Sequence, residues 1–157
     1  MKAHLGNKAM PAGRQGFTLI ELLIAMAIMG ILATVGLGSF RTAQMRGRDT
    51  ERKSDLKQIS NAIELYYQDY NRYPATFIFS GEFTDSKTSY MKVVHNDPTG
   101  ACPYIYKVSS TGKSYQLFAR LENTEDKNID PAITIPCGSN KYNFSITSSN
   151  VTPTESI

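Results

Sequence analysis

The stretch FTLIELLIAMAIMGILATVGLGSF, from Phe17 to Phe40, decides the fold of this chain. It holds a single charged side chain, Glu21, close to its start. At about 1.5 Å per residue, a helix of this length crosses the roughly 30 Å hydrocarbon layer of a bilayer. An acid at the centre of such a span costs about 2.5 to 3.5 kcal/mol, and less near an end. We therefore expect one membrane-spanning helix whose lone carboxylate has a partner or a function.

The residues at the start of this span resemble a known processing signal. The string GFTLIELL, from Gly16 to Leu23, is similar to the class III signal of type IV pilins and of the pseudopilins of type II secretion systems. The leader before it carries three basic residues, Lys2, Lys8 and Arg14. The resemblance implies that a prepilin peptidase cuts between Gly16 and Phe17 and methylates the new amino terminus. It also implies a pilin-like α+β fold, with one long helix on a small antiparallel sheet.

The predicted cleavage gives Glu21 a counter-ion. Cutting after Gly16 creates a cationic amine on Phe17 that the precursor lacks. A buried charge without a partner is far costlier than a paired one, so we expect Glu21 of one subunit to meet the amine of a neighbour. The alternative is that Glu21 only complements the dipole of its own helix, which favours an acid in the first turn by about 0.3 to 1 kcal/mol.

Two other readings of the apolar stretch remain in view. A secretory signal peptide has an apolar region of about 7 to 15 residues that ends at a cleavage site, whereas the predicted cut here precedes a longer stretch. A plain membrane anchor fits the length but does not account for the order Gly-Phe-Thr-Leu-Ile-Glu. Basic residues are more numerous after the span than before it, which by itself favours the opposite orientation. We therefore infer the orientation from the resemblance, which implies that the leader lies in the cytoplasm and the head outside.

Composition and motifs favour a structural subunit over an enzyme. The chain has 17 basic and 14 acidic side chains, and the leader accounts for the whole excess, so nucleic acid is not an expected partner. A phosphate-binding glycine loop, an HExxH motif and an interpretable catalytic triad are all missing from the sequence. The resemblance implies a subunit that polymerises with itself and related minor pilins into a type IV pilus-like filament. It implies three further partners: prepilin peptidase, an inner-membrane assembly platform and membrane lipid.

Two alternatives to the pilus assignment stay open. The first is a pseudopilin of a type II secretion system or of a DNA-uptake machine, which shares the same processing signal. The second is a membrane-anchored binding domain that never polymerises. The sequence alone does not show whether the chain serves a pilus, a secretion system or a DNA-uptake machine.

The chain divides into five predicted segments. They are a leader (1–16), a transmembrane helix (17–40), an amphipathic helix (41–73), a β head (74–147) and a flexible tail (148–157). The amphipathic helix has an apolar stripe at spacings of three and four, which we expect to pack on the sheet. The stripe consists of Leu56, Ile59, Ile63, Tyr66, Tyr67 and Tyr70. Asn71 and Pro74 mark its end, because proline and the residue before it resist helix. The charged run Arg41–Lys53 is predicted to be a solvated or subunit-facing surface.

The remainder of the head is predicted to be strands. The expected strands are Tyr90–His95, Pro103–Val108, Ser114–Leu121, Ala132–Pro136 and Lys141–Thr147. Ser109–Lys113 is expected to form a glycine-containing hairpin turn between the second and the third. Side chains of the third strand alternate between two sets, as expected for a sheet that packs one of its faces on the helix.

Two features of the head concern cross-links and metals. Cys102 and Cys137 both fall in the part placed outside the cytoplasm, so we expect a disulfide, with two free thiols as the alternative. The loop Glu122–Asp130 is rich in oxygen ligands, and Glu122, Asp126 and Asp130 are its candidate calcium ligands. It lacks EF-hand spacing, and an ordinary solvated acidic loop is the alternative. We therefore expect no cofactor, with calcium as the exception to test.

Overall fold

A computed structural model describes residues 16 to 157, so the predicted leader lies outside the described residues except for Gly16. The chain separates into two units, one ending at Phe40 and the other beginning at Arg41. A single helix, α1, runs from Leu19 to Tyr70 and contributes to both units. The prediction of one long amino-terminal helix is therefore confirmed.

The part of α1 in the first unit has an apolar and open surface. By length and composition α1 is able to cross a membrane, and none of its apolar window is buried inside the structure. The large apolar side chains that are at least half exposed are Leu19, Ile20, Leu22, Leu23, Ile24, Met26, Ile28, Met29, Ile31, Leu32, Leu37 and Phe40. A surface of this kind is stable only when lipid or another protein covers it.

In the second unit, the predicted stripe of α1 forms the core. Leu56, Ile59 and Ile63 are at most 2% exposed, and the aromatic rings of the next turns pack against them. The helix ends at Tyr70, one residue before Asn71, which takes a left-handed conformation with φ of 53°. A left-handed residue after the last turn is a common helix stop, so the predicted stop at Asn71 is confirmed, although the helix ends three residues before the expected boundary at residue 73.

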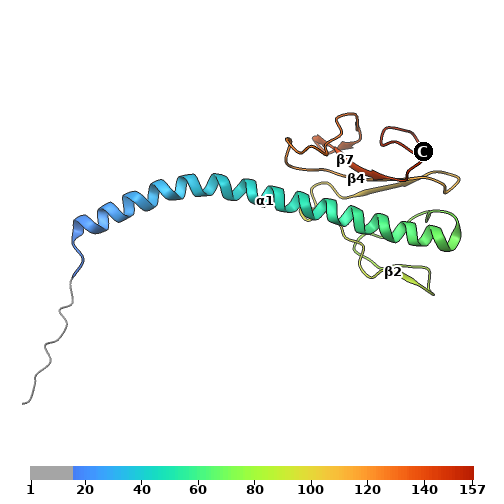
Figure 1. Cartoon of the computed structure of the whole chain (residues 1–157), viewed down its shortest axis with the longest axis horizontal. Coiled ribbons are helices and arrows are strands. Elements are labelled where there is room, and N and C mark those ends of the chain that lie inside the picture. Colours follow the sequence, from blue (N-terminus) through green and yellow to red (C-terminus); the bar gives the residue numbers. More distant parts are fainter. Residues whose placement is uncertain (1–15) are drawn as a thin grey trace, which may run out of the picture. The chain divides into compact units, whose positions relative to one another are not determined.

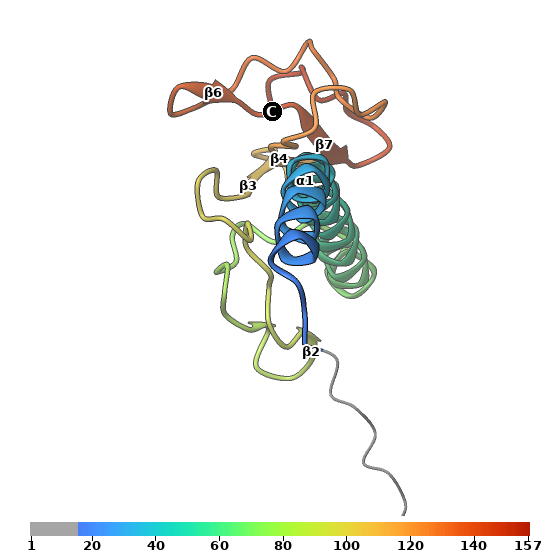
Figure 2. The ribbon, with the colours of Figure 1, turned by 90° about the vertical axis from the view of Figure 1, so that its left-hand side faces the viewer.

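Seven short strands build the head around this helix. They are β1 (Phe83–Thr84), β2 (Ser89–Met91), β3 (Ile105–Val108), β4 (Tyr115–Ala119), β5 (Pro136–Cys137), β6 (Asn140–Lys141) and β7 (Phe144–Thr147). The main sheet is antiparallel with the order β3-β4-β7, and two separate hairpins pair β1 with β2 and β5 with β6. Figures 1 and 2 show β4 and β7 on one side of the head's part of α1 and β2 on the other. The small antiparallel sheet is as expected for the α+β class.

The hairpin between β3 and β4 confirms the most specific turn prediction. Val108 pairs with Tyr115, and the turn between them closes with a hydrogen bond from the Gly112 amide to the Ser109 carbonyl (2.8 Å). Gly112 has φ of +67°, a conformation that only glycine adopts at little cost. This is why the turn needs glycine at that position.

The central strand β4 is buried on both faces, which the sequence pattern did not indicate. Leu117 and Tyr115 face the core on α1, whereas Phe118 belongs to a second cluster with Cys102, Ile133 and Tyr142. The loop before β3 and the loops after β4 therefore form a third layer over the sheet. The expected packing of one face on the helix is present, and the cover on the other face was not predicted because these loops come from residues distant in sequence.

Three strand predictions need correction. The prediction for Ala132–Pro136 was wrong, since only Pro136 lies in a strand, Ala132 lies in a turn and the three residues between them have no regular structure. The strand expected at Tyr90–His95 ends at Met91, and the one expected at Lys141–Thr147 is divided between β6 and β7. Short β-branched runs predict extended backbone, but pairing also requires a partner strand in register.

The last ten residues pack on the head. Val151 is 8% exposed. The Gln116 side-chain amide donates hydrogen bonds to the carbonyls of Thr152 (2.7 Å) and Glu155 (2.8 Å). The segment predicted as a flexible tail is thus held against β4 by a buried glutamine.

Candidate functional site

The first site is the start of α1. Gly16, Phe17 and Thr18 precede the helix, are exposed and have no regular structure. Phe17 is 88% exposed. The bond predicted to be cut, between Gly16 and Phe17, therefore lies in an accessible and non-helical segment.

Glu21 and Thr18 form a reciprocal cap at this helix end. Glu21 Oε2 accepts hydrogen bonds from the Thr18 amide (2.9 Å) and the Thr18 hydroxyl (2.7 Å). The Thr18 hydroxyl oxygen in turn accepts the Glu21 amide at 3.3 Å. This is a capping box, which satisfies amide groups that the first turn leaves without a partner. The spacing Thr-x-x-Glu is a local sequence signature of this motif, so the cap was predictable from the sequence.

The cap leaves part of the Glu21 carboxylate available. Within residues 16–157, every hydrogen bond to the group goes to Oε2, and none goes to Oε1. The predicted partner, the Phe17 amine of a neighbouring chain, exists only in an assembly of processed subunits. The pairing of Glu21 with that amine stays a prediction.

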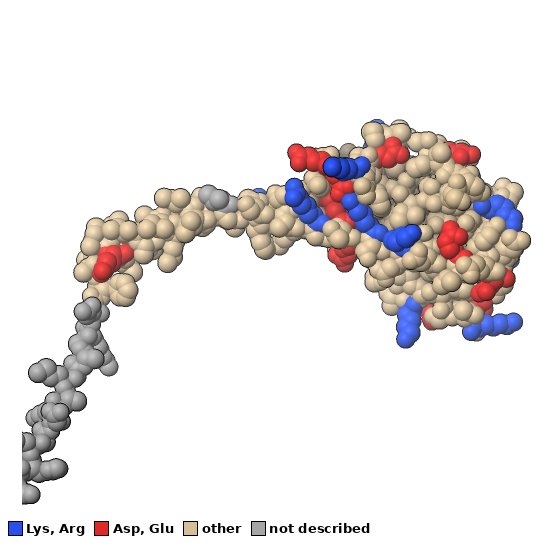
Figure 3. Space-filling view, viewed as in Figure 1, with Lys and Arg blue, Asp and Glu red and all other residues tan. Residues whose placement is uncertain are grey.

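The second site is a cluster of charges in the head, with a buried centre and half-buried flanks. We call it the ion-pair cluster; it comprises Arg48, Asp49, Arg52, Lys53, Asp97, Glu122 and Asp126. Its four members on α1 come from the run predicted to be a solvated or subunit-facing surface. Figure 3 shows basic and acidic side chains lying next to one another on this face of the head.

Arg52 is the centre of the ion-pair cluster. Its side chain is 2% exposed and contacts three carboxylates: Asp97 at 2.6 Å, Asp49 at 2.8 Å and Glu122 at 2.8 Å. Burial disfavours its charge, but hydrogen bonds to Asp97 and Glu122 outweigh this and raise its pKa further above its ordinary range. Arg52 is therefore fully cationic and neutralises groups from both loops that flank it.

Asp49 connects α1 to the acidic loop through the backbone. Its Oδ1 accepts the amide of Glu122 (2.9 Å) and its Oδ2 accepts the amide of Asn123 (2.8 Å). Asp49 is 2% exposed, so these bonds are protected from water. Hydrogen bonds to a charged acceptor are about twice as strong as neutral ones.

Two further pairs flank this centre. Arg48 donates to both oxygens of Glu122, at 2.9 and 2.5 Å, and Lys53 contacts Asp126 at 2.6 Å. The hydrogen bond from Arg48, with a smaller contribution from Arg52, lowers the pKa of Glu122 to about 2. The pKa of Asp126 is also lowered, chiefly by its hydrogen bond from Lys53.

The ion-pair cluster corrects one prediction and bears on the candidate calcium ligands. The run Arg41–Lys53 is not a wholly solvated surface, because Asp49 and Arg52 turn inward onto the loops that carry Asp97 and Glu122. Two of the three candidate calcium ligands, Glu122 and Asp126, bind cations of α1 instead of facing one another. In the part of the chain that the structure describes, no three His, Cys, Asp or Glu side chains are placed to hold a metal ion.

The disulfide prediction is confirmed. Cys102 and Cys137 are bonded, with Cα atoms 5.8 Å apart. Cys102 is 4% exposed and lies in the second cluster beside Phe118. The bond therefore ties the loop before β3 to the β5–β6 hairpin across the outer face of the sheet. The alternative of two free thiols is excluded.

We expect the head to lose stability as the pH falls from about 4.5 towards 2. Glu122 has a folded pKa of about 2 against an ordinary value of 4.5. A carboxyl group with a lowered folded pKa contributes its full stability above the unfolded value and loses it as the pH falls through the folded one. Urea unfolding of the full chain in detergent, at pH 7, 4 and 3, measures this loss.

Two variants separate Glu122 from the other acids. Glu122→Gln removes the titrating group and should make unfolding less dependent on pH. Glu125→Gln changes an exposed acid of the same loop and should leave the dependence unchanged. If Glu122→Gln keeps the wild-type dependence, another carboxyl group causes the loss.

The start of the chain matches a family model described as the prokaryotic N-terminal methylation motif, over residues 11–37. The chain is similar to the type IV major pilin protein PilA of Myxococcus xanthus, with 29% identity over 89% of this chain and 56% of that protein. It is also similar to the type II secretion system core protein G of Pseudomonas aeruginosa, with 28% identity over 68% of this chain and 82% of that protein.

A third relative is more similar over most of its length. The type IV major pilin protein PilE1 of Neisseria gonorrhoeae is 32% identical over 70% of this chain and 71% of its own length. By contrast, the chain spans little more than half the length of the Myxococcus protein. No solved structure gives a significant match.

Proposed function

Because the chain belongs to the type IV pilin family, we propose that it is the precursor of a subunit that polymerises into a type IV pilus-like filament. One observation carries the proposal. An exposed, non-helical Gly16–Phe17 bond directly precedes an apolar helix with an open surface, and the only charge in its predicted span is Glu21. A subunit with this surface requires membrane before assembly and other subunits after it.

Processing and assembly are linked through Glu21. Cleavage after Gly16 supplies an amine at Phe17, beside the apolar surface where the carboxylate lies. Glu21 Oε2 stays with the Thr18 cap, and Oε1, which accepts no hydrogen bond from residues 16–157, can accept the amine of the next subunit. A carboxylate shared in this way satisfies both the helix end and the buried cation, and it sets the stagger between subunits.

The location and the partners follow from the same proposal. The precursor would sit in the cytoplasmic membrane as a single-pass protein with its leader inside. A prepilin peptidase acts on it, and an assembly platform in the same membrane extracts it into the filament. The head would then lie outside the cytoplasm, which agrees with its disulfide.

A second candidate is a pseudopilin of a type II secretion system. It is favoured by the length match, since the chain covers 82% of the Pseudomonas core protein G. The two candidates differ in their product: a pilus forms long surface fibres, whereas a secretion pseudopilus is required for export of proteins. Electron microscopy of cells with and without the gene, together with an assay of secreted protein, distinguishes them.

We expect Glu21→Gln to be processed normally but to enter filaments poorly. Glutamine at this position retains the capping box and removes only the charge. Intact mass should show loss of Met1–Gly16 and a methylated Phe17 in the variant and the wild type alike. The fraction of each protein in sheared filaments, with wild-type subunits co-expressed, then measures assembly.

Thr18→Val is the matched control for this variant. It removes the two hydrogen bonds of the Thr18 hydroxyl and keeps the backbone amide bond and the charge of Glu21, so it should enter filaments much better than Glu21→Gln. Normal entry of Glu21→Gln would refute the ionic role, and failure of Thr18→Val alone would assign the effect to the cap. A mature protein that still carries Met1–Gly16 would refute the processing step itself.

A further inference from the structure

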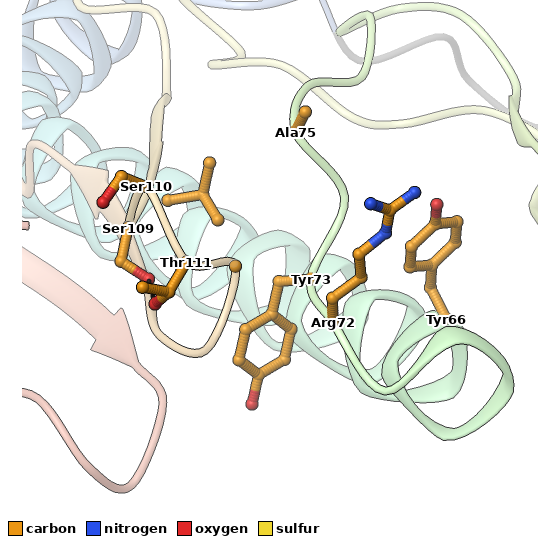
Figure 4. Close-up of a pocket in the computed structure, with 9 residues that line it drawn as sticks. Tyr66, Arg72, Tyr73, Ala75, Ser109, Ser110 and Thr111 are labelled. Atoms are coloured by element: carbon orange, nitrogen blue, oxygen red, sulfur yellow. Dashed lines mark hydrogen bonds between the residues drawn. The ribbon is translucent and has the colours of Figure 1, made fainter.

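A cavity of about 400 Å³ lies between the end of α1 and the β3–β4 turn. Figure 4 shows Arg72 and Tyr66 on one side of it, and Ser109, Ser110 and Thr111 on the opposite side. Its volume is in the range of small-ligand sites, about 300 to 1,000 Å³. None of the residues that line it has a part in the proposed polymerisation through Glu21.

The walls of this cavity are fixed to each other. The Tyr73 amide donates a hydrogen bond to the Gly112 carbonyl at 2.8 Å, and the Lys113 ammonium donates to the Asn71 carbonyl. Gly112 also lies so near Arg72 that an added Cβ would come within 3.3 Å of the Arg72 Cβ. These contacts hold the end of α1 and the β3–β4 turn together, so the cavity keeps its shape without a ligand. A preformed site lowers the entropy cost of binding.

The charge of the cavity comes from Arg72. Among the described residues that line it, Arg72 alone is charged, and within residues 16–157 no hydrogen bond or ion pair reaches its guanidinium. The nearby cation Lys113 is occupied by Asn71 and lies 5.4 Å from the centre of the Tyr67 ring. One unpaired guanidinium suits one carboxylate, which it binds through two parallel hydrogen bonds.

The remaining walls indicate the body of the ligand. Tyr66 presents a partly buried ring beside the guanidinium; Tyr70 stacks on this ring with the centroids 4.6 Å apart, so a ligand would meet the part of the ring that Tyr70 does not cover. The opposite wall is a turn of two serines and a threonine, whose backbone and hydroxyl groups form a polar rim. A sugar ring has an apolar face and hydroxylated edges, so it matches both walls. An acyl chain would instead require a closed apolar pocket.

From these features we propose that this cavity binds a sugar acid, that is, a sugar that carries one carboxylate. Arg72 holds the carboxylate, Tyr66 contacts the face of the ring and the Ser109–Thr111 turn contacts its hydroxyls. The ligand is either a free sugar acid or one residue of an acidic polysaccharide. The site does not depend on the filament proposal, because all of its residues belong to the head.

Titration of the full chain in detergent with glucuronate tests the site. Backbone amide NMR signals of Ser110, Thr111 and Gly112 should shift and saturate at millimolar ligand. Glucose, which lacks the carboxylate, should bind at least tenfold more weakly. Equal shifts with glucose, or no saturable shift with glucuronate, would overturn the proposal.

Substitutions and a polymer complete the test. Arg72→Gln should weaken glucuronate binding at least tenfold, whereas Arg120→Gln, which changes an arginine bonded to Asn140 elsewhere in the head, should not change it. An Arg72→Gln variant that binds normally would contradict the assignment. If polygalacturonate binds at least tenfold more tightly per sugar than galacturonate, the ligand is a polysaccharide; equal affinity per sugar identifies a free sugar acid.

Discussion

Replacing Arg52 by methionine should reduce the free energy of unfolding of the head by about 3 to 5 kcal/mol. Arg52 is the shared partner of Asp49, Asp97 and Glu122, and both it and the first two carboxylates are at most 2% exposed. Removing the guanidinium leaves buried negative charges without compensation. Native domains are stable by only about 5 to 15 kcal/mol, so this change removes a large share of the total.

Tyrosine fluorescence during urea unfolding measures this effect in the full chain. The chain has nine tyrosines and no tryptophan, and the first tyrosine is Tyr66, so the signal comes from the head and not from the apolar span. Arg46→Met is the matched control: Arg46 is exposed on the same helix, and within residues 16–157 its side chain has no ion pair. We expect the control to change stability by less than about 0.5 kcal/mol. Equal losses for the two variants would show that the buried carboxylates do not depend on Arg52.

Removing the disulfide, by Cys102→Ala with Cys137→Ala, should cost roughly 3 to 4 kcal/mol. The bond joins residues 35 positions apart, and a loop of this length loses that much conformational freedom in the unfolded chain on the chain-entropy model. Alanine is preferable to serine because Cys102 is buried beside Phe118, where a hydroxyl would need a partner.

A reduced wild-type sample provides the control for this prediction. Urea unfolding with excess dithiothreitol should give the midpoint of the double variant, because both lack the same bond. A double variant as stable as the oxidised wild type would contradict the role given to the disulfide. A reduced wild type that remains more stable than the variant would assign part of the cost to lost packing.

Features set by neighbouring residues could be predicted from the sequence. The stripe of Leu56, Ile59 and Ile63 follows the helical repeat, and Asn71 ends the helix for a local conformational reason. The β3–β4 turn follows from Gly112 and the strands beside it. Each of these depends on a few consecutive residues, so pattern and propensity decide them.

Features set by distant residues could not be predicted. The residues next to Arg52 do not distinguish a buried arginine from a solvated one. Arg52 is buried because it pairs with Asp97 and Glu122, which lie 45 and 70 positions away in the sequence. The burial of Phe118 depends in the same way on Ile133 and Tyr142. By contrast, the Thr18–Glu21 cap is local, and its spacing was readable in the sequence.

The three cations Arg48, Arg52 and Lys53 join one short segment of α1 to loops of the head. A force that pulls this segment along its own axis would load these bonds in shear and simultaneously, so no single bond would carry the whole tension. Separating this segment from the loops would then require several charge pairs to break together, so the attachment of the head to its helix is mechanically strong.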